Sequence, residues 1–354
     1  MTRVLVSARV LDKQVGGNTR YARTIYSGLA RHGVEHVLGR PPLASGRARS
    51  AVYAGWEGVV WPLAPGKSVD VLHFPADTGA VVPGRVPIVS TVHGLATLHI
   101  EGVRSPRADR LWRARVSRLV EVSDEIITIS NSSARDIDTI VPGAMAKITV
   151  IPHGIDHRTF TPHEGAADEA ERARFELDGP YFLYLGNIDP RKNVIELCRA
   201  AEQVFARTGI PLLISGAPAW ESESIMQVVE STRGVRYLGR VSDEALVPLL
   251  RGAVAFVFPS KYEGFGFPVA EAMACGTPVI CSDRGSLGEV AGDAALLVQG
   301  LDADSIAAEM LRVAEDEQLR TDLRRRGLVN VQRFVWETSI AEHARVLTRA
   351  AAAR

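Results

Sequence analysis

Residues 258–271 read FPSKYEGFGFPVAE, and this stretch decides the fold. The apolar run that ends at Phe258 is typical of a buried strand, two glycines follow in a loop, and Pro268 stands where Pro often begins a helix. Gly264 and Gly266 allow the backbone to approach a ligand closely, and free N–H groups at a helix start favour an anion such as phosphate. The stretch therefore predicts a strand, an anion-binding loop and a helix of an α/β domain.

Two carboxylates flank this loop. Glu263 lies within it, and Glu271 lies about one helical turn beyond Pro268. A carboxylate accepts paired hydrogen bonds from neighbouring hydroxyls, so two carboxylates beside an anion site suit a sugar nucleotide. The alternative is an ordinary strand–loop–helix turn with two solvated acids, which Gly-x-Gly alone would not exclude. The complete string favours the ligand.

A second segment, YLGNIDPRKN at 184–193, also ends a predicted strand. Gly186 is expected to turn the chain, and Arg191 and Lys192 to open the next helix. Two cations at the carboxyl end of a strand can neutralise a diphosphate, Arg as a fork and Lys as a point charge. Cations at a helix start oppose the helix dipole, so the placement needs an anion or solvent. The ligand is favoured because both segments end strands of one predicted sheet.

Short apolar runs alternate with amphipathic helical stretches in both halves of the chain, which indicates parallel strands with helical crossovers. In the first half, strands are expected at 3–7, 69–74, 87–92, 125–129 and 147–151, and helices at 19–31, 107–122 and 132–140. In the second half, strands are expected at 181–185, 211–215, 235–238, 254–258, 277–281 and 294–298, and helices at 192–207, 243–251, 268–274, 303–316 and 319–333. An acidic, Ala-rich stretch without periodicity at 157–180 separates the halves. The predicted fold class is α/β, with two doubly wound Rossmann-like domains facing across a deep cleft.

Length and composition agree with this prediction. The 354 residues are 46% hydrophobic and 23% charged, which suits two globular domains. The three cysteines have no CxxC or His-rich spacing, so neither a disulfide framework nor a zinc site is expected. The N-terminus lacks a signal-peptide pattern and no apolar run is long enough to span a bilayer, so a cytoplasmic protein is expected.

The formal net charge of zero hides an asymmetry between the halves. Residues 1–160 carry +7 and residues 161–354 carry −7. Opposite charges help two halves to face each other, or they equip the first half for an anionic partner. Nucleic acid is not expected, because the chain has no motif that combines aromatic and basic residues and no strongly basic domain.

The first half offers further candidates. Gly16 and Gly17 follow the first strand closely enough to form a second backbone cradle, and His93 ends an apolar strand. Position alone supports a structural and a catalytic His93 equally. Residues 104–118 contain six Arg and one Asp beside an apolar side. A basic amphipathic helix there could hold an anionic acceptor, lie on a membrane surface or present a solvated face. Its candidate acceptor-binding residues are Arg107, Arg110, Arg113 and Trp112.

At these motifs the sequence resembles the retaining glycosyltransferases of family 4, which have the GT-B fold, and within them the mannosyltransferase-like branch. The resemblance covers nearly the whole chain. It rests on the Gly-Gly loop at 16–17, VIPHGID at 150–156, LGNIDPRKN at 185–193 and, most strongly, EGFGFPVAEAMACGTPV at 263–279. Many members have Arg directly after the glycine of the Leu-Gly segment, where this chain has Asn187.

The resemblance implies a division of labour between domains. Residues 1–156 would form an acceptor-binding domain, residues 165–334 the donor-binding domain, and a helix at about 336–354 would pack back on the first domain. Catalytic roles would fall to His93, Arg191, Lys192 and Glu263. The donor-binding residues would be Gly16, Gly17, Gly186, Arg191, Lys192, Glu263, Gly264, Phe265, Gly266, Phe267 and Glu271.

Within that set, the resemblance implies individual roles. Glu263 would bind hydroxyls of the donor sugar, and Gly264 to Phe267 would present amides to sugar and phosphate. Glu271 would hold the ribose. Arg191 and Lys192 would neutralise the leaving diphosphate, and Gly16 and Gly17 would approach it from the other domain. His93 occupies the position of the family's histidine near the transferred sugar.

The function implied is retaining transfer of a hexose, first of all mannose from GDP-mannose, to a glycan or lipid-linked acceptor in cell-surface polysaccharide or glycolipid biosynthesis. No metal or other cofactor is expected, and peripheral contact with the inner membrane face is possible. Three alternatives stay open: a UDP-sugar such as UDP-glucose as donor, a nucleotide-sugar epimerase or pseudo-glycosyltransferase on the same fold, and a non-catalytic nucleotide-sugar-binding protein.

Overall fold

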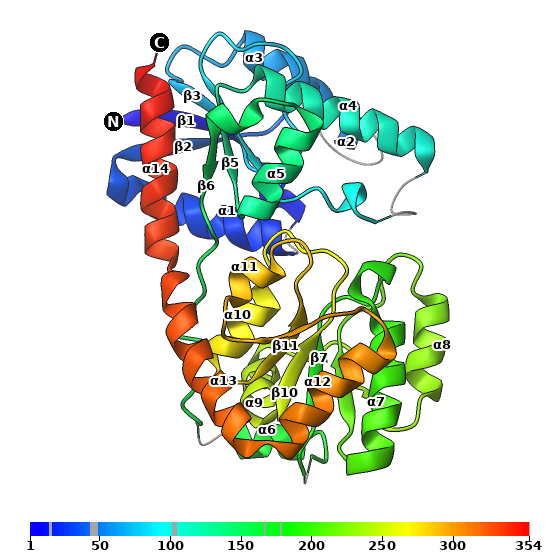
Figure 1. Ribbon diagram of the computed structural model, residues 1–354. Helices are drawn as coiled ribbons and strands as arrows, with labels where there is room; N and C mark the ends of the chain where they lie inside the picture. Colours follow the sequence, from blue (N-terminus) through cyan, green and yellow to red (C-terminus); the bar gives the residue numbers. More distant parts are fainter. Residues whose placement is uncertain (14–15, 43–48, 101–104, 166–167, 178, 354) are drawn as a thin grey trace. The chain divides into compact units, whose positions relative to one another are not determined.

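The computed structural model describes residues 1–13, 16–42, 49–100, 105–165, 168–177 and 179–353 (Figure 1). The chain forms two compact units. Unit 1 comprises Met1–Gly154 and Val335–Arg354, and unit 2 comprises Ile155–Phe334. The chain thus leaves unit 1 once and returns to it for the last helix.

The described part of unit 1 contains a six-stranded parallel sheet in the order β2-β1-β3-β4-β5-β6. Its strands are β1 (Thr2–Ser7), β2 (Val34–Gly39), β3 (Val71–Phe74), β4 (Ile88–Val92), β5 (Glu125–Thr128) and β6 (Ile148–Val150). Its helices are α1 (Gly17–Gly28), α2 (Arg49–Gly55), α3 (Trp61–Leu63), α4 (Pro106–Val122), α5 (Asn131–Ile140) and α14 (Trp336–Ala352), with a π-helical turn at Trp56–Val60 and 3₁₀ turns at Leu11–Lys13, Leu29–His32, Ala96–Leu98 and Ala144–Lys147.

Unit 2, where described, repeats the architecture with the order β12-β11-β10-β7-β8-β9. Its strands are β7 (Phe182–Leu185), β8 (Leu212–Ser215), β9 (Val235–Tyr237), β10 (Ala255–Phe258), β11 (Val279–Ser282) and β12 (Leu296–Val298). Its helices are α6 (Asp168–Ala173), α7 (Val194–Thr208), α8 (Glu223–Ser231), α9 (Asp243–Gly252), α10 (Phe267–Ala274), α11 (Leu287–Ala291), α12 (Ala303–Glu315) and α13 (Glu317–Asn330), with 3₁₀ turns at Pro190–Lys192 and Val331–Arg333.

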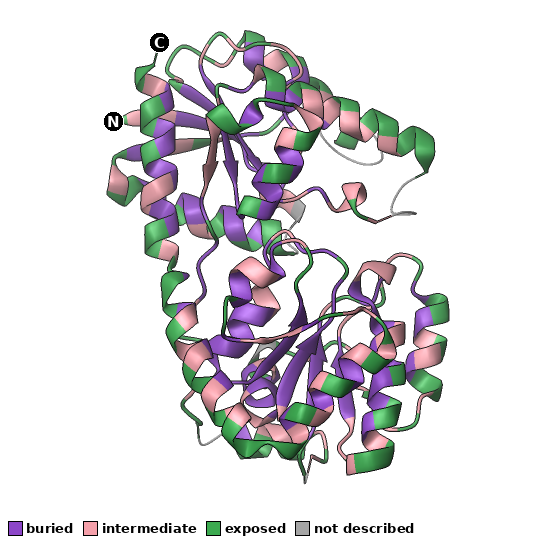
Figure 2. Cartoon of the chain, in the orientation of Figure 1, coloured by how far each residue is buried: buried purple, intermediate pink, exposed green. Residues whose placement is uncertain are grey.

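Helices cover both faces of each sheet, so the central strands are buried on both sides (Figure 2). Every residue of β7, β8, β10 and β11 is buried. This is why these strands appear in the sequence as continuous apolar runs rather than as an alternation of apolar and polar residues. The expected α/β class with two doubly wound parallel sheets is confirmed.

Sequence reasoning missed several elements. Strand β2 lies at the edge of its sheet, and exposed Glu35 and half-buried His36 interrupt its apolar pattern. Helices α2, α3, α8 and α11 are short, and α6 lies within the stretch interpreted as a structureless boundary. Short helices and edge strands depend on tertiary contacts more than on local pattern, which explains these omissions.

A buried chain of hydrogen bonds attaches α14 to the rest of unit 1. The Tyr21 hydroxyl on α1 lies 2.9 Å from Thr91 Oγ1 on β4 and 2.8 Å from His343 Nε2 on α14. The other ring nitrogen of His343, Nδ1, lies 2.7 Å from the carbonyl oxygen of Ser339. A carbonyl only accepts, so Nδ1 carries the proton of His343 and Nε2 accepts from Tyr21.

The chain of hydrogen bonds continues to β3 with the same direction. Because Tyr21 donates its proton to His343, its oxygen accepts from the Thr91 hydroxyl. Thr91 Oγ1 in turn lies 3.0 Å from His73 Nε2, and His73 Nδ1 lies 2.9 Å from the Tyr26 hydroxyl. Each group therefore donates once to the next, from Tyr26 to Ser339. Both histidines in this series of hydrogen bonds, His73 and His343, are neutral. Full satisfaction is what allows these polar groups to be buried.

We expect acid to destabilise unit 1. Burial lowers the pKa of His73 to about 3 and the pKa values of His93 and His343 to about 4, below the ordinary value of 6.5. The unfolded chain therefore binds more protons than the folded chain below pH 6.5, and the free energy of unfolding falls as the pH decreases from 6.5 to about 4. At pH 5 the loss is about 2 kcal/mol per buried histidine, measurable by urea denaturation at pH 7 and pH 5.

Two variants test the assignment of this effect. His343→Gln should lower stability at pH 7 but reduce the pH dependence by about one proton. His163→Gln, at an exposed site of unit 2, is the control and should keep the stability of the parent at pH 7. Equal free energies of unfolding at pH 7 and pH 5 in the parent would contradict the neutral, buried histidines.

Candidate functional site

The two segments selected from the sequence come together in unit 2. They follow β7 and β10, which are adjacent parallel strands with Phe256 opposite Leu183. From this pair the chain order of strands runs outward in both directions, so β7 and β10 form the switch point of the sheet, where α/β proteins bind ligands. The amide of Lys261 donates to the carbonyl of Arg191 over 2.8 Å and joins the two loops.

Glu263 is the centre of the resulting cluster. Lys192 Nζ lies 2.5 Å from its Oε1, and Arg191 Nη1 lies 3.1 Å from its Oε2. The Ser260 hydroxyl donates to Oε1 over 2.6 Å. Glu263, Lys192 and Ser260 are buried, at 8%, 7% and 0% exposure. We call Glu263, Lys192 and Arg191 the ionic clamp.

The charges of the ionic clamp are maintained by one another. Burial alone would raise the pKa of Glu263, but the neighbouring Lys192 and Arg191 hold it below its usual range. Burial lowers the pKa of Lys192, against the attraction of Glu263. The pKa of Arg191 is raised, because Glu263 and Asp189 outweigh the effect of burial. The buried ammonium of Lys192 and the half-buried guanidinium of Arg191 therefore share the buried carboxylate of Glu263, and Arg191 also lies 3.6 Å from the carboxylate of Asp189.

Arg191 and Lys192 do not open helix α7, contrary to expectation. They lie in a 3₁₀ turn capped by Asp189, whose Oδ1 accepts from the Arg191 amide over 3.0 Å, and α7 begins at Val194 after the left-handed Asn193. The turn lets the Lys192 ammonium lie 4.7 Å from the centre of the Phe258 ring, a cation–π contact. Arg191 and Lys192 thus lie near the carboxyl ends of β7 and β10, outside the first turn of α7.

Helix α10 begins directly beside the ionic clamp. Gly266, with φ 93°, precedes its first turn, and a Cβ there would lie 2.5 Å from Leu287 Cδ2, so only glycine fits. No side-chain hydrogen bond caps the helix: Pro268 in its first turn has no N–H, and the Val269 amide donates to the Gly266 carbonyl over 3.0 Å. Gly264 and Phe267 are half-buried, Phe265 is buried, and Glu271 is buried in the helix at 7% exposure.

A third loop, which sequence reasoning missed, fixes Glu263 from the end of β11. The amide and the hydroxyl of Ser286 each lie 3.0 Å from the Glu263 carbonyl oxygen. A Cβ on Gly285 would lie 2.4 Å from that oxygen, so the approach requires glycine. Gly285 and Ser286 follow a predicted strand. That position at a strand end is the signal in the sequence that could have identified them as part of the site. Asn187, the departure from the family pattern noted in the sequence, is exposed, and its backbone carbonyl accepts from the Tyr184 hydroxyl.

The remaining candidates belong to unit 1. His93 is 8% exposed, and its Nε2 lies 3.0 Å from the carbonyl of Pro75, so Nε2 carries the proton. Its Nδ1 has no hydrogen-bond partner among the described residues and is available as an acceptor. The ring packs edge-on against Tyr21, 4.6 Å between centres. Gly16, with φ 97°, precedes the first turn of α1, which Gly17 begins.

The basic stretch forms helix α4. Arg107 and Arg110 are exposed on it, whereas Arg113 donates to Asp109 and to the Thr97 carbonyl. Trp112 is half-buried. No helix in the described part of the chain combines the length and apolar character needed to cross a membrane. Within the same described ranges, no three His, Cys, Asp or Glu side chains gather in a way that could hold a metal ion.

Two family models match the chain. The model described as "Glycosyltransferase Family 4" matches residues 15–159, and the model described as "Glycosyl transferases group 1" matches residues 167–328. Together they cover most of both units in the order expected for this architecture. The chain belongs to the family 4 glycosyltransferases with the GT-B fold.

Curated relatives include mannosyltransferases. O-antigen chain mannosyltransferase B of Escherichia coli is 44% identical over 162 residues, which are 44% of this chain and 42% of that protein. MMP alpha-(1->4)-mannosyltransferase of Mycolicibacterium hassiacum is 31% identical over 75% of this chain and 66% of that protein. The chain thus spans between 42% and 66% of the length of these two relatives. Among solved structures, sucrose-phosphate synthase from Thermosynechococcus elongatus aligns over 100% of both chains with a TM-score of 0.80 and 22% identity, a likeness of fold.

Glu263→Gln should make the protein depend on an added anion. The substitution leaves Lys192 and Arg191 without their buried carboxylate partner, which typically costs about 3–5 kcal/mol. Inorganic pyrophosphate should then raise the melting temperature of this variant more than that of the parent. Differential scanning fluorimetry over a pyrophosphate titration measures both effects.

Asp168→Asn is the matched control. It breaks another buried ion pair of unit 2, in which Arg251 Nη1 lies 2.7 Å from Asp168 Oδ2. This variant should also be destabilised, but pyrophosphate should protect it no better than the parent. Equal protection of both variants would mean that the ionic clamp is not an anion site.

Proposed function

We propose that the chain transfers a hexose, with retention of anomeric configuration, from a nucleoside diphosphate sugar to a hydroxyl of a glycan or lipid-linked acceptor. The observation that carries this proposal is the ionic clamp at the switch point of unit 2, beside the first turn of α10. A buried ammonium beside a half-buried guanidinium suits the charge of a leaving diphosphate. Mannose from GDP-mannose is the first candidate donor, since named relatives are mannosyltransferases.

On this proposal, the cations of the ionic clamp exchange partners when the donor binds. Arg191 and Lys192 then bind the diphosphate. Its negative charge replaces that of Glu263, which neutralises the two cations when no donor is bound. Glu263 is then free to accept hydrogen bonds from hydroxyls of the sugar. Glu271, on α10, would hold the ribose. A site whose charges are already fixed in place stabilises a leaving group without reorganising during the reaction.

The chemical step breaks the bond between the anomeric carbon and the β-phosphate oxygen, and the acceptor hydroxyl forms the new glycosidic bond. The acceptor proton passes to the departing phosphate, whose growing charge Lys192 and Arg191 stabilise. His93 would use its unprotonated Nδ1 to accept a hydrogen bond from the transferred sugar. No metal is assigned to the reaction, and the measurements below include a chelator for this reason.

The acceptor is proposed to be part of a cell-surface polysaccharide or glycolipid. The exposed Arg107 and Arg110 on α4 would suit a phosphorylated or lipid-linked acceptor, and would also favour peripheral contact with an anionic membrane. A cytoplasmic location accords with such a role.

Thermal stabilisation by a panel of GDP-, UDP- and dTDP-sugars, with and without EDTA, identifies the donor. A nucleotide sugar at 100 times its dissociation constant adds about 2.7 kcal/mol of stability. We expect GDP-mannose to produce this shift and EDTA to leave it unchanged. A shift with UDP-sugars alone would replace mannose from GDP-mannose with the UDP alternative, and no shift with any nucleotide would contradict the donor site.

Lys192→Ala should lower kcat by about 10²–10³, because it removes one charge that stabilises the leaving diphosphate. Lys67→Ala, at an exposed site of unit 1, is the control and should retain the activity of the parent. Turnover of Lys192→Ala within a few-fold of the parent would contradict the assignment. NMR of the product separates transfer with retention from an isomerised nucleotide sugar, and binding without turnover would indicate a non-catalytic protein.

A further inference from the structure

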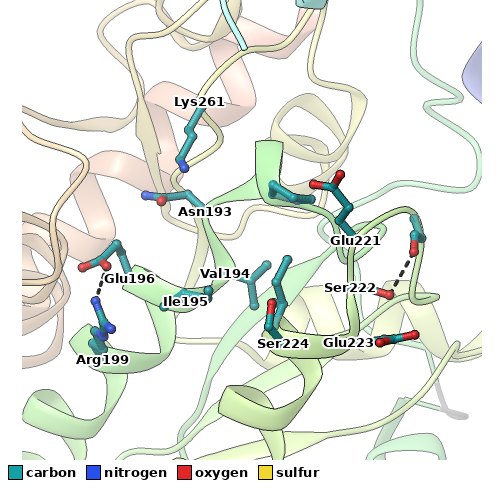
Figure 3. Close-up of a pocket in the computed structure, with 13 residues that line it drawn as sticks. Asn193, Val194, Ile195, Glu196, Arg199, Glu221, Ser222, Glu223, Ser224 and Lys261 are labelled. Atoms are coloured by element: carbon teal, nitrogen blue, oxygen red, sulfur yellow. Dashed lines mark hydrogen bonds and ion pairs between the residues drawn. The ribbon is translucent and has the colours of Figure 1, made fainter. Parts of the chain in front are cut away.

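A cavity of about 800 Å³ lies in unit 2 beside the ionic clamp. It lies at the carboxyl ends of β7 and β8. Figure 3 shows Val194, Ile195 and Glu196 on the first turn of α7, and Ser224 on the first turn of α8. Its volume is that of a site for a small molecule or a short oligosaccharide.

The cavity is distinct from the ionic clamp but shares a wall with it. The side chains of Glu263, Arg191 and Lys192 do not line the cavity, whereas Asn193 and Lys261, directly beside them in the chain, do. The amide of Lys261 donates to the carbonyl of Arg191 over 2.8 Å. A ligand in the cavity would therefore lie next to the proposed donor site without competing for its charged groups.

The polar groups of the cavity include both donors and acceptors. The Asn193 amide nitrogen is occupied by the Leu301 carbonyl at 2.8 Å, which fixes the side chain and leaves its oxygen as an acceptor. Lys261 is exposed, and its ammonium has no ion pair with any described residue. The exposed carboxylates of Glu221 and Glu223 likewise have no ion pair within the described ranges (Figure 3).

The charges of the lining favour a neutral ligand. Glu196 is neutralised by Arg199, with Oε1 to Nη1 at 2.5 Å. The unpaired Glu221 and Glu223 would repel a phosphate, and Lys261 would repel a cation. A hydroxyl both donates and accepts, so a molecule with many hydroxyls can satisfy carboxylates and an ammonium together. The apolar side chains of Val194, Ile195 and Ile225 offer contacts for the C–H faces of such a molecule.

We infer that this cavity binds sugar units of the acceptor glycan, those preceding the hydroxyl that is glycosylated. The inference rests on the proposed function, which supplies a glycan as acceptor, and it assigns a second glycan-binding element to unit 2 in addition to the acceptor candidates of unit 1. Glu221 and Glu223 accept hydrogen bonds from sugar hydroxyls, and Lys261 donates to one. Because the cavity adjoins the loops that carry the ionic clamp, a glycan held there is anchored beside the donor.

Methyl NMR with manno-oligosaccharides of two to four residues tests the inference directly. In the full-length protein with labelled Ile and Val methyl groups, these probes should shift the signals of Val194, Ile195 and Ile225. The double variant Glu221→Gln, Glu223→Gln should weaken this binding, and should raise the KM for the acceptor about tenfold with the KM for the donor unchanged. None of these residues belongs to the ionic clamp.

Glu176→Gln is the matched control. Glu176, like Glu221, is an exposed glutamate of unit 2 with a positive φ, 51° against 49°, and it does not line the cavity. This variant should bind and turn over as the parent does. Donor binding and turnover without methyl shifts, or with the same acceptor KM in the double variant, would overturn the inference and leave the proposed function intact. Methyl shifts in a protein that binds no nucleotide sugar would instead contradict the proposed function.

Discussion

The pairing of Lys192 and Arg191 with the carboxylate of Glu263 is the constraint around which unit 2 is arranged. A buried ammonium is stable only beside an anion, so Lys192 must stay close to Glu263. This ion pair holds the loop after β7 against the loop after β10. The strand order makes this contact possible, since β7 and β10 are neighbours although 69 residues lie between the last residue of β7 and the first residue of β10. On the proposed function, a bound diphosphate would replace Glu263 as the partner of these cations.

The fold class could be predicted from the sequence because strands of a buried parallel sheet appear there as continuous apolar runs. Both sheets and most long helices could be predicted on that basis. The elements that could not be predicted are those whose burial depends on contacts with segments far away in the sequence. Strand β2 carries Glu35 and His36 and is a strand only because β1 lies beside it. Helix α8 is short, and it gains its apolar contacts from α7 and β9 rather than from its own length.

The site was partly predictable for a similar reason. Residue type and spacing selected Glu263, Arg191 and Lys192, since carboxylates and cations at strand ends are rare and conspicuous. Spacing could not tell that both cations would contact Glu263, or that Ser260 of the same loop and Ser286 of a third loop would hold it. The cavity bordered by Asn193 and Lys261 could not be predicted either, because its lining comes from three separate segments of the chain with no common motif.

The route of the chain has a consequence for biosynthesis. Unit 2 is an insertion: its last residue, Phe334, is made before α14, which unit 1 needs to complete its core. On the ribosome, unit 2 has its whole sequence available while unit 1 still lacks His343, the acceptor for the buried Tyr21 hydroxyl. The core that α1 shares with α14 on one side of this sheet therefore stays incomplete until α14 has been made. The domain begun first is the one finished last.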